Sequence, residues 1–195
     1  MTARRPALPT LCDTAVVAMT GSIGTLWAAL FVLELRAGGH VREVRVVMSP
    51  SAAQFVTPVA MRAISGAPVL TTLFDADAPF PIGHVQISDG ADIMVVMPAT
   101  ANIIGKVAGG LADGAVSASI MASACPVVFV PSMNERMWRR AAVQRNVRAL
   151  VQDGYHVVPP VAGTVVSTGR TAIGGMPDTE TLIKSLRKIV RPPRR

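Results

Sequence analysis

Cysteine, charged residues and aromatic residues are all scarce in this sequence. The 195 residues include two cysteines, Cys12 and Cys125, which lack the spacing of a metal site and are too few for a disulfide framework. Charged residues make up 16% of the chain and aromatic residues 4%, whereas 50% of the residues are hydrophobic. This composition excludes a disordered chain and a disulfide-stapled scaffold, and it predicts a folded protein with much buried surface. So little cysteine fits a reducing compartment, and we expect a cytoplasmic protein.

The formal net charge of +7 is not arranged in a pattern typical of nucleic-acid binding. The arginines are scattered, and the one dense run, residues 191–195, is expected to be a flexible basic tail. Residues 14–33 are uncharged over about the length of a bilayer, but their centre, Thr20-Gly21-Ser22-Ile23-Gly24-Thr25, has the composition of a turn. We therefore predict a strand followed by a helix, and neither a nucleic-acid nor a membrane partner. A cleavable signal is not expected either, because prolines and Asp13 follow the basic start.

Short β-branched runs alternate with segments of helical spacing along the chain. The predicted strands are residues 15–19, 44–48, 93–97, 127–130 and 156–158, and the predicted helices include 26–36, 101–111, 142–152 and 178–190. This alternation predicts one α/β domain over residues 1–195, a doubly wound parallel sheet of the Rossmann-like kind, with ligands at the carboxyl ends of the strands. Residues 71–83 and 163–177 show the least regular structure. The second, with four glycines, is either a flap over a site or a plain surface connection.

Two turns between a predicted strand and a predicted helix carry groups that bind phosphate. In residues 20–25 these are free backbone N–H groups and the hydroxyls of Ser22 and Thr25. The segment lacks the Gly-Lys-Ser/Thr of a Walker loop and the complete three-glycine dinucleotide fingerprint, so an ordinary strand-to-helix turn is an equal interpretation. The second turn adds the hydroxyls of Ser49 and Ser51. Two such turns after adjacent strands favour one shared phosphate group.

Two further segments are more specific: Pro98-Ala99-Thr100-Ala101-Asn102 and Pro131-Ser132-Met133-Asn134-Glu135-Arg136-Met137-Trp138. They resemble the Pro-Ala-Ser-Ala-Asn-Thr and Pro-x-Met-Asn-x-x-Met-Trp signatures of the homo-oligomeric flavin-containing cysteine decarboxylases. That family includes lantibiotic-type peptidyl-cysteine decarboxylases and phosphopantothenoylcysteine decarboxylase. The likeness covers nearly the whole chain and includes residues 14–25, 49–58, 84–88 and 144–146.

The resemblance implies a flavin, FMN or FAD, held between subunits of a trimer or a dodecamer. The flavin contacts that it implies are Gly21, Ser22, Ile23, Ser49, Ser51, Phe55, Pro98, Ala99, Thr100 and Asn102. His84 would be the active-site base, and Asn134 would hold the substrate carboxylate. The expected substrate contacts are Asn102, Met133, Asn134, Met137 and Thr168. No metal site is expected.

The chemistry of these side chains agrees with the implied roles without selecting them. The imidazole of His84, with an ordinary pKa of about 6.5, suits proton transfer, although a structural histidine would look the same. The amide of Asn134 can donate to a carboxylate while staying neutral, and the same residue can cap a helix over residues 135–138. Met137 and Trp138 are typical packing residues.

In this family the flavin is implied to oxidise a cysteine thiol to a thioaldehyde, which then loses carbon dioxide to leave an enethiol. Phosphopantothenoylcysteine decarboxylases carry an Ala-Cys-Gly near the flap whose cysteine is implied to reduce that product, whereas this chain has Ser167-Thr168-Gly169. Because Thr168 cannot perform thiol redox chemistry, we expect the reaction to stop at the enethiol. Thr100 and Ile103 also replace the serine and the final threonine of the loop signature.

Thr168 in place of the reducing cysteine favours oxidative decarboxylation of the C-terminal cysteine of a ribosomally made precursor peptide to an aminoenethiol, as in lanthipeptide or linaridin biosynthesis. One alternative is the phosphopantothenoylcysteine decarboxylase of coenzyme A biosynthesis. Another is a non-catalytic flavin-binding regulatory protein, against which the presence of His84 and Asn134 argues. A flavin prenyltransferase ranks lower, because that family lacks the methionine-asparagine-tryptophan segment.

Overall fold

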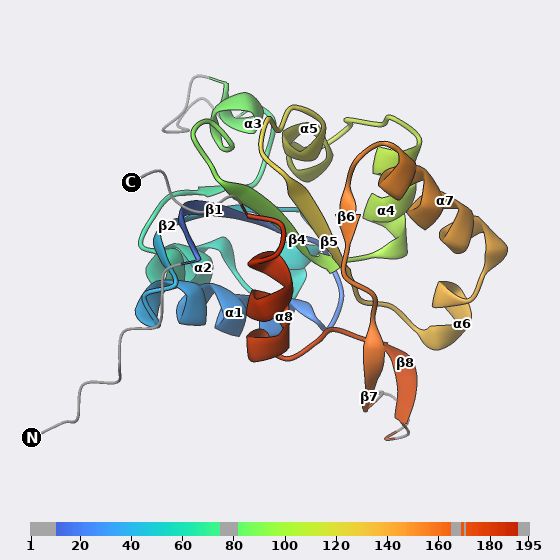
Figure 1. The fold of residues 1–195 in the computed structure, drawn as a ribbon. Helices are drawn as coiled ribbons and strands as arrows, with labels where there is room; N and C mark the ends of the chain where they lie inside the picture. The colour runs from blue at the N-terminus through green and yellow to red at the C-terminus, as the bar shows by residue number, and fades with distance from the viewer. Residues whose placement is uncertain (1–10, 75–81, 165–168, 170, 191–195) are drawn as a thin grey trace, which may run out of the picture.

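The computed structural model describes residues 11–74, 82–164, 169 and 171–190, which form one α/β unit (Figure 1). Six parallel strands make the main sheet in the order β3-β2-β1-β4-β5-β6. They are β1 (Cys12–Met19), β2 (Val41–Met48), β3 (Val69–Leu70), β4 (Ile93–Ala99), β5 (Val127–Pro131) and β6 (His156–Val157). A separate antiparallel pair consists of β7 (Val161–Thr164) and β8 (Thr171–Gly175). The predicted doubly wound parallel sheet is confirmed.

Helices cover both faces of the main sheet. They are α1 (Thr25–Ala37), α2 (Pro58–Ser65), α3 (Gly83–Gln86), α4 (Ala101–Ala108), α5 (Ala115–Met121), α6 (Glu135–Trp138), α7 (Ala141–Gln152) and α8 (Thr179–Leu186), with a short 3-10 turn, η1 (Ala52–Gln54). Apolar residues of α1, α2 and α8 pack on one face, and those of α4, α5 and α7 pack on the other. The central strands are therefore buried on both sides, which explains why β4 reads as an unbroken apolar run.

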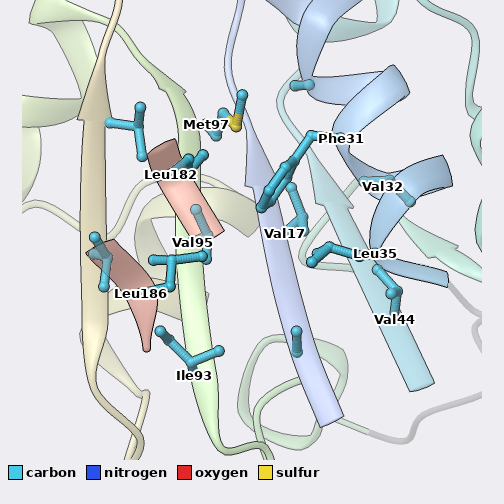
Figure 2. Close-up of a cluster of buried hydrophobic side chains, with 14 of the residues drawn as sticks. Val17, Phe31, Val32, Leu35, Val44, Ile93, Val95, Met97, Leu182 and Leu186 are labelled. Carbon is cyan, nitrogen blue, oxygen red and sulfur yellow. The ribbon is translucent and has the colours of Figure 1, made fainter. Parts of the chain in front are cut away.

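The core beneath α1 and α8 shows how the helices are fixed to the sheet (Figure 2). Phe31 and Leu35 of α1 lie toward Val17 of β1, and Leu182 of α8 lies near Val95 of β4. All five of these side chains are fully buried, each stabilising the fold by about 1.5–3 kcal/mol in apolar transfer terms. This packing holds the turns at the carboxyl ends of β1 and β4 in fixed positions.

Several expectations need correction. The segment 163–177, expected to lack regular structure, includes β8 and the end of β7, which form a hairpin beside α6 (Figure 1). The helix predicted to reach residue 111 ends at Ala108, because Gly110 adopts a left-handed φ of +71° just after it. The helix predicted over 178–190 spans Thr179–Leu186. Most of residues 71–83, Thr168 and the tail 191–195 lie outside the described residues.

No helix in the described part of the chain is long and apolar enough to cross a membrane.

Candidate functional site

The turns after β1 and β2 meet at the carboxyl edge of the sheet. The Ser49 N–H donates to the Met19 carbonyl at 3.0 Å, which joins the second turn to the end of β1. Gly21 packs so closely on Ser51 that a Cβ placed on it would come within 2.4 Å of the Ser51 Cβ. Among the described residues, the backbone N–H groups of Gly21 and Ile23 have no hydrogen-bond acceptor. The two turns therefore pack together as one unit, in which the N–H groups of Gly21 and Ile23 are available to a ligand.

Thr20 joins this pair of turns to the loop after β4. Its hydroxyl donates to the Pro98 carbonyl at 2.6 Å and accepts from the Thr100 N–H at 3.3 Å. Thr100 in turn is the N-cap of α4, its hydroxyl accepting from the Ile103 N–H. Thr20 is 4% exposed, so this buried hydroxyl fixes the β4 loop relative to the first turn. The sequence places Thr20 in a turn but carries no local signal for this role.

A pocket of about 460 Å³ opens where these loops converge, a size typical of small-molecule sites. It is lined by Thr20, Gly21, residues 49–51, Thr100, Asn102, Ile103, Lys106 and residues 113–117. Five of the ten residues predicted to contact a flavin are in this lining: Gly21, Ser49, Ser51, Thr100 and Asn102.

The other five predicted contacts lie beside the pocket lining. Pro98 and Ala99 are buried within β4, where Pro98 offers its carbonyl to Thr20. Ser22 Oγ accepts from the Gly24 N–H and lies 3.3 Å from Ser132 Oγ. Ile23 and Phe55 expose apolar side chains at the surface.

Thr25, expected to offer its hydroxyl to a phosphate, does not do so. The side chain is fully buried, and its hydroxyl lies 2.6 Å from the Ser22 carbonyl and 2.9 Å from the Thr20 carbonyl. The Thr25 hydroxyl therefore stabilises the turn through hydrogen bonds to its backbone.

A polar group on the far wall of the pocket was not found from the sequence. Lys106 Nζ of α4 donates to the Asp113 carboxylate at 2.7 Å, and Ser117 Oγ of α5 donates to the same carboxylate at 3.2 Å. The hydrogen bond from Lys106, followed by that from Ser117, holds the pKa of Asp113 below its usual value. The Asp113 carboxylate neutralises the Lys106 ammonium on this wall, so the donors for an anionic ligand are the hydroxyls and the free N–H groups opposite.

His84 stands on α3 and does not line this pocket. It is half-buried, and its Nδ1 is buried without a hydrogen-bond partner among the described residues. An unpaired buried nitrogen is costly, and because Nδ1 has almost no accessible surface, a ligand or another chain can reach it only if the imidazole turns.

Asn134 is the N-cap of α6, its Oδ1 accepting from the Arg136 N–H at 2.9 Å. The capping role is confirmed, and the amide NH₂ of this exposed side chain remains a free donor for a ligand. The neighbouring Met133 N–H donates to the Gly174 carbonyl of β8, which ties the hairpin to this loop. Met137 on α6 is largely exposed.

The two predicted catalytic residues are not brought together in one copy of the chain. Figure 1 shows α3, which carries His84, and α6, which Asn134 caps, at opposite sides of the molecule. A reaction that uses both side chains at one point would need residues from two copies.

Both cysteines lie at the amino ends of the strands, away from the pocket. Cys12 begins β1, and Cys125 lies just before β5, whereas the pocket is at the carboxyl ends of the strands. Burial, followed by the charge of Asp92, raises the pKa of the Cys12 thiol to about 12, and burial also raises that of Cys125. Neither thiol can act in this pocket. The described residues contain no cluster of three or more His, Cys, Asp or Glu side chains that could hold a metal ion.

The fold and the pocket define a Rossmann-like α/β protein with an anion-suited site at a strand-end switch point. A family model described as Flavoprotein matches residues 12–191, and the chain belongs to that family. The predicted membership of the flavin-containing cysteine decarboxylase family is thereby confirmed.

Three similar proteins indicate the range of this family. The coenzyme A biosynthesis bifunctional protein CoaBC of Bacillus subtilis (strain 168) is 35% identical over 174 residues, which are 89% of this chain and 42% of that protein. The chain thus spans less than half the length of this curated relative. The solved structure of the FMN-dependent cysteine decarboxylase SpaF is 32% identical with a TM-score of 0.74, covering 90% of this chain and 95% of that chain. That of TvaF, an FMN-dependent cysteine decarboxylase from thioviridamide biosynthesis, is 35% identical with a TM-score of 0.69, covering 75% and 89%.

Proposed function

We propose that this protein is an FMN-dependent decarboxylase that converts the C-terminal cysteine of a ribosomally made precursor peptide into an aminoenethiol. The observation that carries the proposal is the pocket itself, in which Gly21, Ser51 and Thr100 meet at the carboxyl edge of the sheet. SpaF and TvaF, both FMN-dependent cysteine decarboxylases, cover most of this chain at over 30% identity. This similarity supports both the cofactor and the reaction class.

The pocket residues fit a flavin mononucleotide. The unpaired N–H groups of the first turn and the hydroxyls of Ser49 and Ser51 suit a phosphate. When bound, the flavin would supply the two-electron oxidation of the substrate cysteine that makes loss of carbon dioxide easy. Asn102 at the start of α4 would orient flavin and substrate through its exposed amide.

The proposed substrate contacts lie on the loops after β4 and β5. The free NH₂ of Asn134 would donate to the cysteine carboxylate and, being neutral, would not hold the charge that decarboxylation must lose. Asn102, Met133 and Met137 would contact the peptide. Thr168, which lies outside the described residues, is proposed as a further substrate contact. Exposed arginines on α6, on α7 and between them, including Arg136, Arg140 and Arg145, would attract an anionic C-terminus.

The His84 imidazole would accept the proton of the substrate thiol. Because α3 and α6 stand apart in one copy, His84 and Asn134 would meet only across a contact between copies, so we propose a homo-oligomer, a trimer or a dodecamer.

The outer face of α1 supports association between copies. Leu26, Trp27, Leu30 and Leu33, with Ile23 just before the helix, are between 43% and 61% exposed. A helix that is apolar on both faces is typical of one that is buried on both faces. A contiguous apolar patch of this kind marks a contact surface.

The position of the cysteines favours the oxidised product. Reduction of the enethiol to a saturated thiol would require a reactive cysteine at the site, and both cysteines lie at the opposite edge with raised pKa values. The flavin would then be left reduced for an outside oxidant. Both thiols are free, which is compatible with the proposed cytoplasmic location.

Phosphopantothenoylcysteine decarboxylation is the second candidate, favoured by the 35% identity to CoaBC. Mass spectrometry separates the two. Purified protein with bound flavin is incubated with synthetic peptides ending in cysteine and, in parallel, with phosphopantothenoylcysteine. Loss of about 46 mass units from a peptide, one carbon dioxide and two hydrogens by the redox chemistry above, is the expected result.

His84→Asn should abolish this loss, whereas His156→Asn, a change at an exposed histidine on β6, should leave it intact. Turnover of phosphopantothenoylcysteine alone would favour the coenzyme A reaction. Turnover of neither substrate would favour a regulatory flavoprotein.

A further inference from the structure

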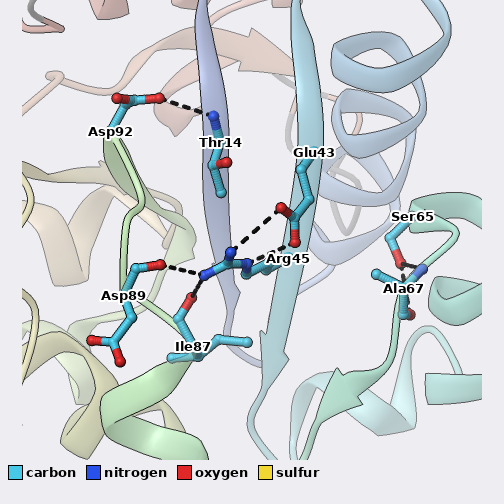
Figure 3. A network of polar contacts seen from close by, with 8 residues as sticks. All are labelled: Thr14, Glu43, Arg45, Ser65, Ala67, Ile87, Asp89 and Asp92. Atoms are coloured by element: carbon cyan, nitrogen blue, oxygen red, sulfur yellow. Dashed lines mark hydrogen bonds and ion pairs between the residues drawn. The ribbon is translucent and has the colours of Figure 1, made fainter. Parts of the chain in front are cut away.

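Arg45 of β2 connects the sheet to the segment that follows α3 (Figure 3). Its Nη1 donates to the Asp89 carbonyl at 2.7 Å and to the Ile87 carbonyl at 3.2 Å. Its Nε donates to Glu43 Oε1 at 2.8 Å. The Arg45 side chain is only 18% exposed, so its guanidinium is held between two elements and largely shielded from water.

These contacts hold the C-cap of a very short helix, Ile87, and the turn that follows it. The last carbonyls of any helix lack partners within it, and a cation there also interacts favourably with the helix dipole. Because α3 has a single turn, from Gly83 to Gln86, it cannot be stable by itself and depends on contacts with its surroundings. The guanidinium supplies donors in a fixed planar fork, and Glu43 holds that fork in orientation.

The dependence matters because α3 carries His84. No hydrogen bond from the imidazole fixes its direction among the described residues, and Nδ1 is buried without a partner. A catalytic base is ordinarily oriented by a third group that it contacts. Here the backbone must do this, and the end of that backbone is held by Arg45, three residues beyond His84 at the Ile87 carbonyl.

We propose that Arg45 is a positioning residue, which fixes the place of the His84 imidazole by holding the C-terminal end of α3 on β2. The inference rests on the proposed function for the role of His84. It assigns to Arg45 no contact with substrate or cofactor.

The molecule offers a matched control for this interaction. Arg36 Nη1 of α1 donates to the Ile64 carbonyl near the end of α2 at 2.9 Å, so it also joins a guanidinium to the carbonyls of a neighbouring helix. The helix α2 carries no predicted site residue. Replacing either arginine by methionine removes a similar helix-end contact, but only Arg45→Met should disturb His84.

The experiment compares wild type, Arg45→Met, Arg45→Lys and Arg36→Met, all loaded with flavin. Arg45→Met should lower kcat for cysteine decarboxylation at least about tenfold with KM changed by less than about twofold, because binding groups are untouched. Arg45→Lys, which keeps one donor and the charge, should restore part of kcat. Arg36→Met should keep kcat within about twofold of wild type, even if its melting temperature falls as far as that of Arg45→Met.

A second readout does not depend on turnover. In protein with isotope-labelled histidine, the His84 imidazole signals should shift or broaden in Arg45→Met and remain unchanged in Arg36→Met. If Arg45→Met and Arg36→Met lose kcat equally and the His84 signals are the same in both, the positioning role is overturned. If wild type decarboxylates nothing, the proposed function fails, and the imidazole signals alone still decide whether Arg45 positions His84.

Discussion

Gly21 lies directly against Ser51, where the turn after β1 meets the turn after β2. A Cβ on Gly21 would come within 2.4 Å of the Ser51 Cβ and 2.8 Å of its carbonyl carbon. Backbone and a short side chain cannot yield to such a contact, so Gly21→Ala must push the two turns apart. We expect flavin affinity to fall at least about tenfold, or ~1.4 kcal/mol, as measured by quenching of flavin fluorescence on titration.

Gly105→Ala is the matched change for this experiment. Gly105 lies within α4, and its Cβ would meet only Asn146 Nδ2, at 3.4 Å. Alanine also has a higher helix propensity than glycine, so flavin affinity and folding should both be retained. Equal flavin affinity in Gly21→Ala and wild type would contradict the assignment of the first turn to the cofactor.

The two cysteine thiols lead to a prediction about the product. With a pKa of about 12, Cys12 is a thiolate in on the order of one molecule in ten thousand at pH 8, so iodoacetamide should not modify it in the native protein. The variant Cys12→Ala with Cys125→Ala should release the same enethiol, at an unchanged ratio to any saturated thiol, in mass spectrometry. A change in that ratio would show that a cysteine of this chain takes part in the redox chemistry.

The Lys106–Asp113 pair makes one part of the stability dependent on acid. Because the folded-state pKa of Asp113 lies below its ordinary value of about 3.9, the pair stabilises the fold above that pH. The contribution is lost as the pH falls through the folded-state value. Lys106→Met should therefore lower the melting temperature at pH 7 and have a smaller effect at pH 3, as measured by calorimetry. An equal loss at both values would assign the effect to packing.

Much of the pocket could be predicted from the sequence because its parts are local. Gly21, Ser49 and Thr100 each follow a buried β-branched run, and parallel strands bring their carboxyl ends to one edge. Asp113 and Ser117 could not be found in this way. They reach the pocket only because the chain turns back after α4 at Gly109 and Gly110, a tertiary arrangement with no local signal.

Two other features were beyond local reasoning. The β7–β8 hairpin has the glycine content of a loop, yet Gly174, with a φ of +142°, lies so close to the Met133 carbonyl that a side chain would not fit. The separation of His84 from Asn134 depends on which edge each loop occupies, and motif matching gives no information about which copy supplies each residue.

The apolar outer face of α1 predicts an oligomer that one charge would weaken. Leu30 is 61% exposed at the centre of that face, so Leu30→Glu would place a carboxylate into any contact between copies. The control is Val151→Glu on α7, where the apolar side chain is 54% exposed on a helix whose other outward residues are largely polar. Light scattering during size-exclusion chromatography should give wild type and Val151→Glu the same multiple of the 20.4 kDa chain and Leu30→Glu a smaller one.

Stable interfaces cover about 800 Å² per partner, so a single central charge that is desolvated there is sufficient to shift the equilibrium. Decarboxylase activity should fall together with the oligomer, because His84 and Asn134 would no longer meet. A Leu30→Glu protein that is monomeric and fully active would overturn the shared site, and an oligomer of unchanged mass would move the contact to another face.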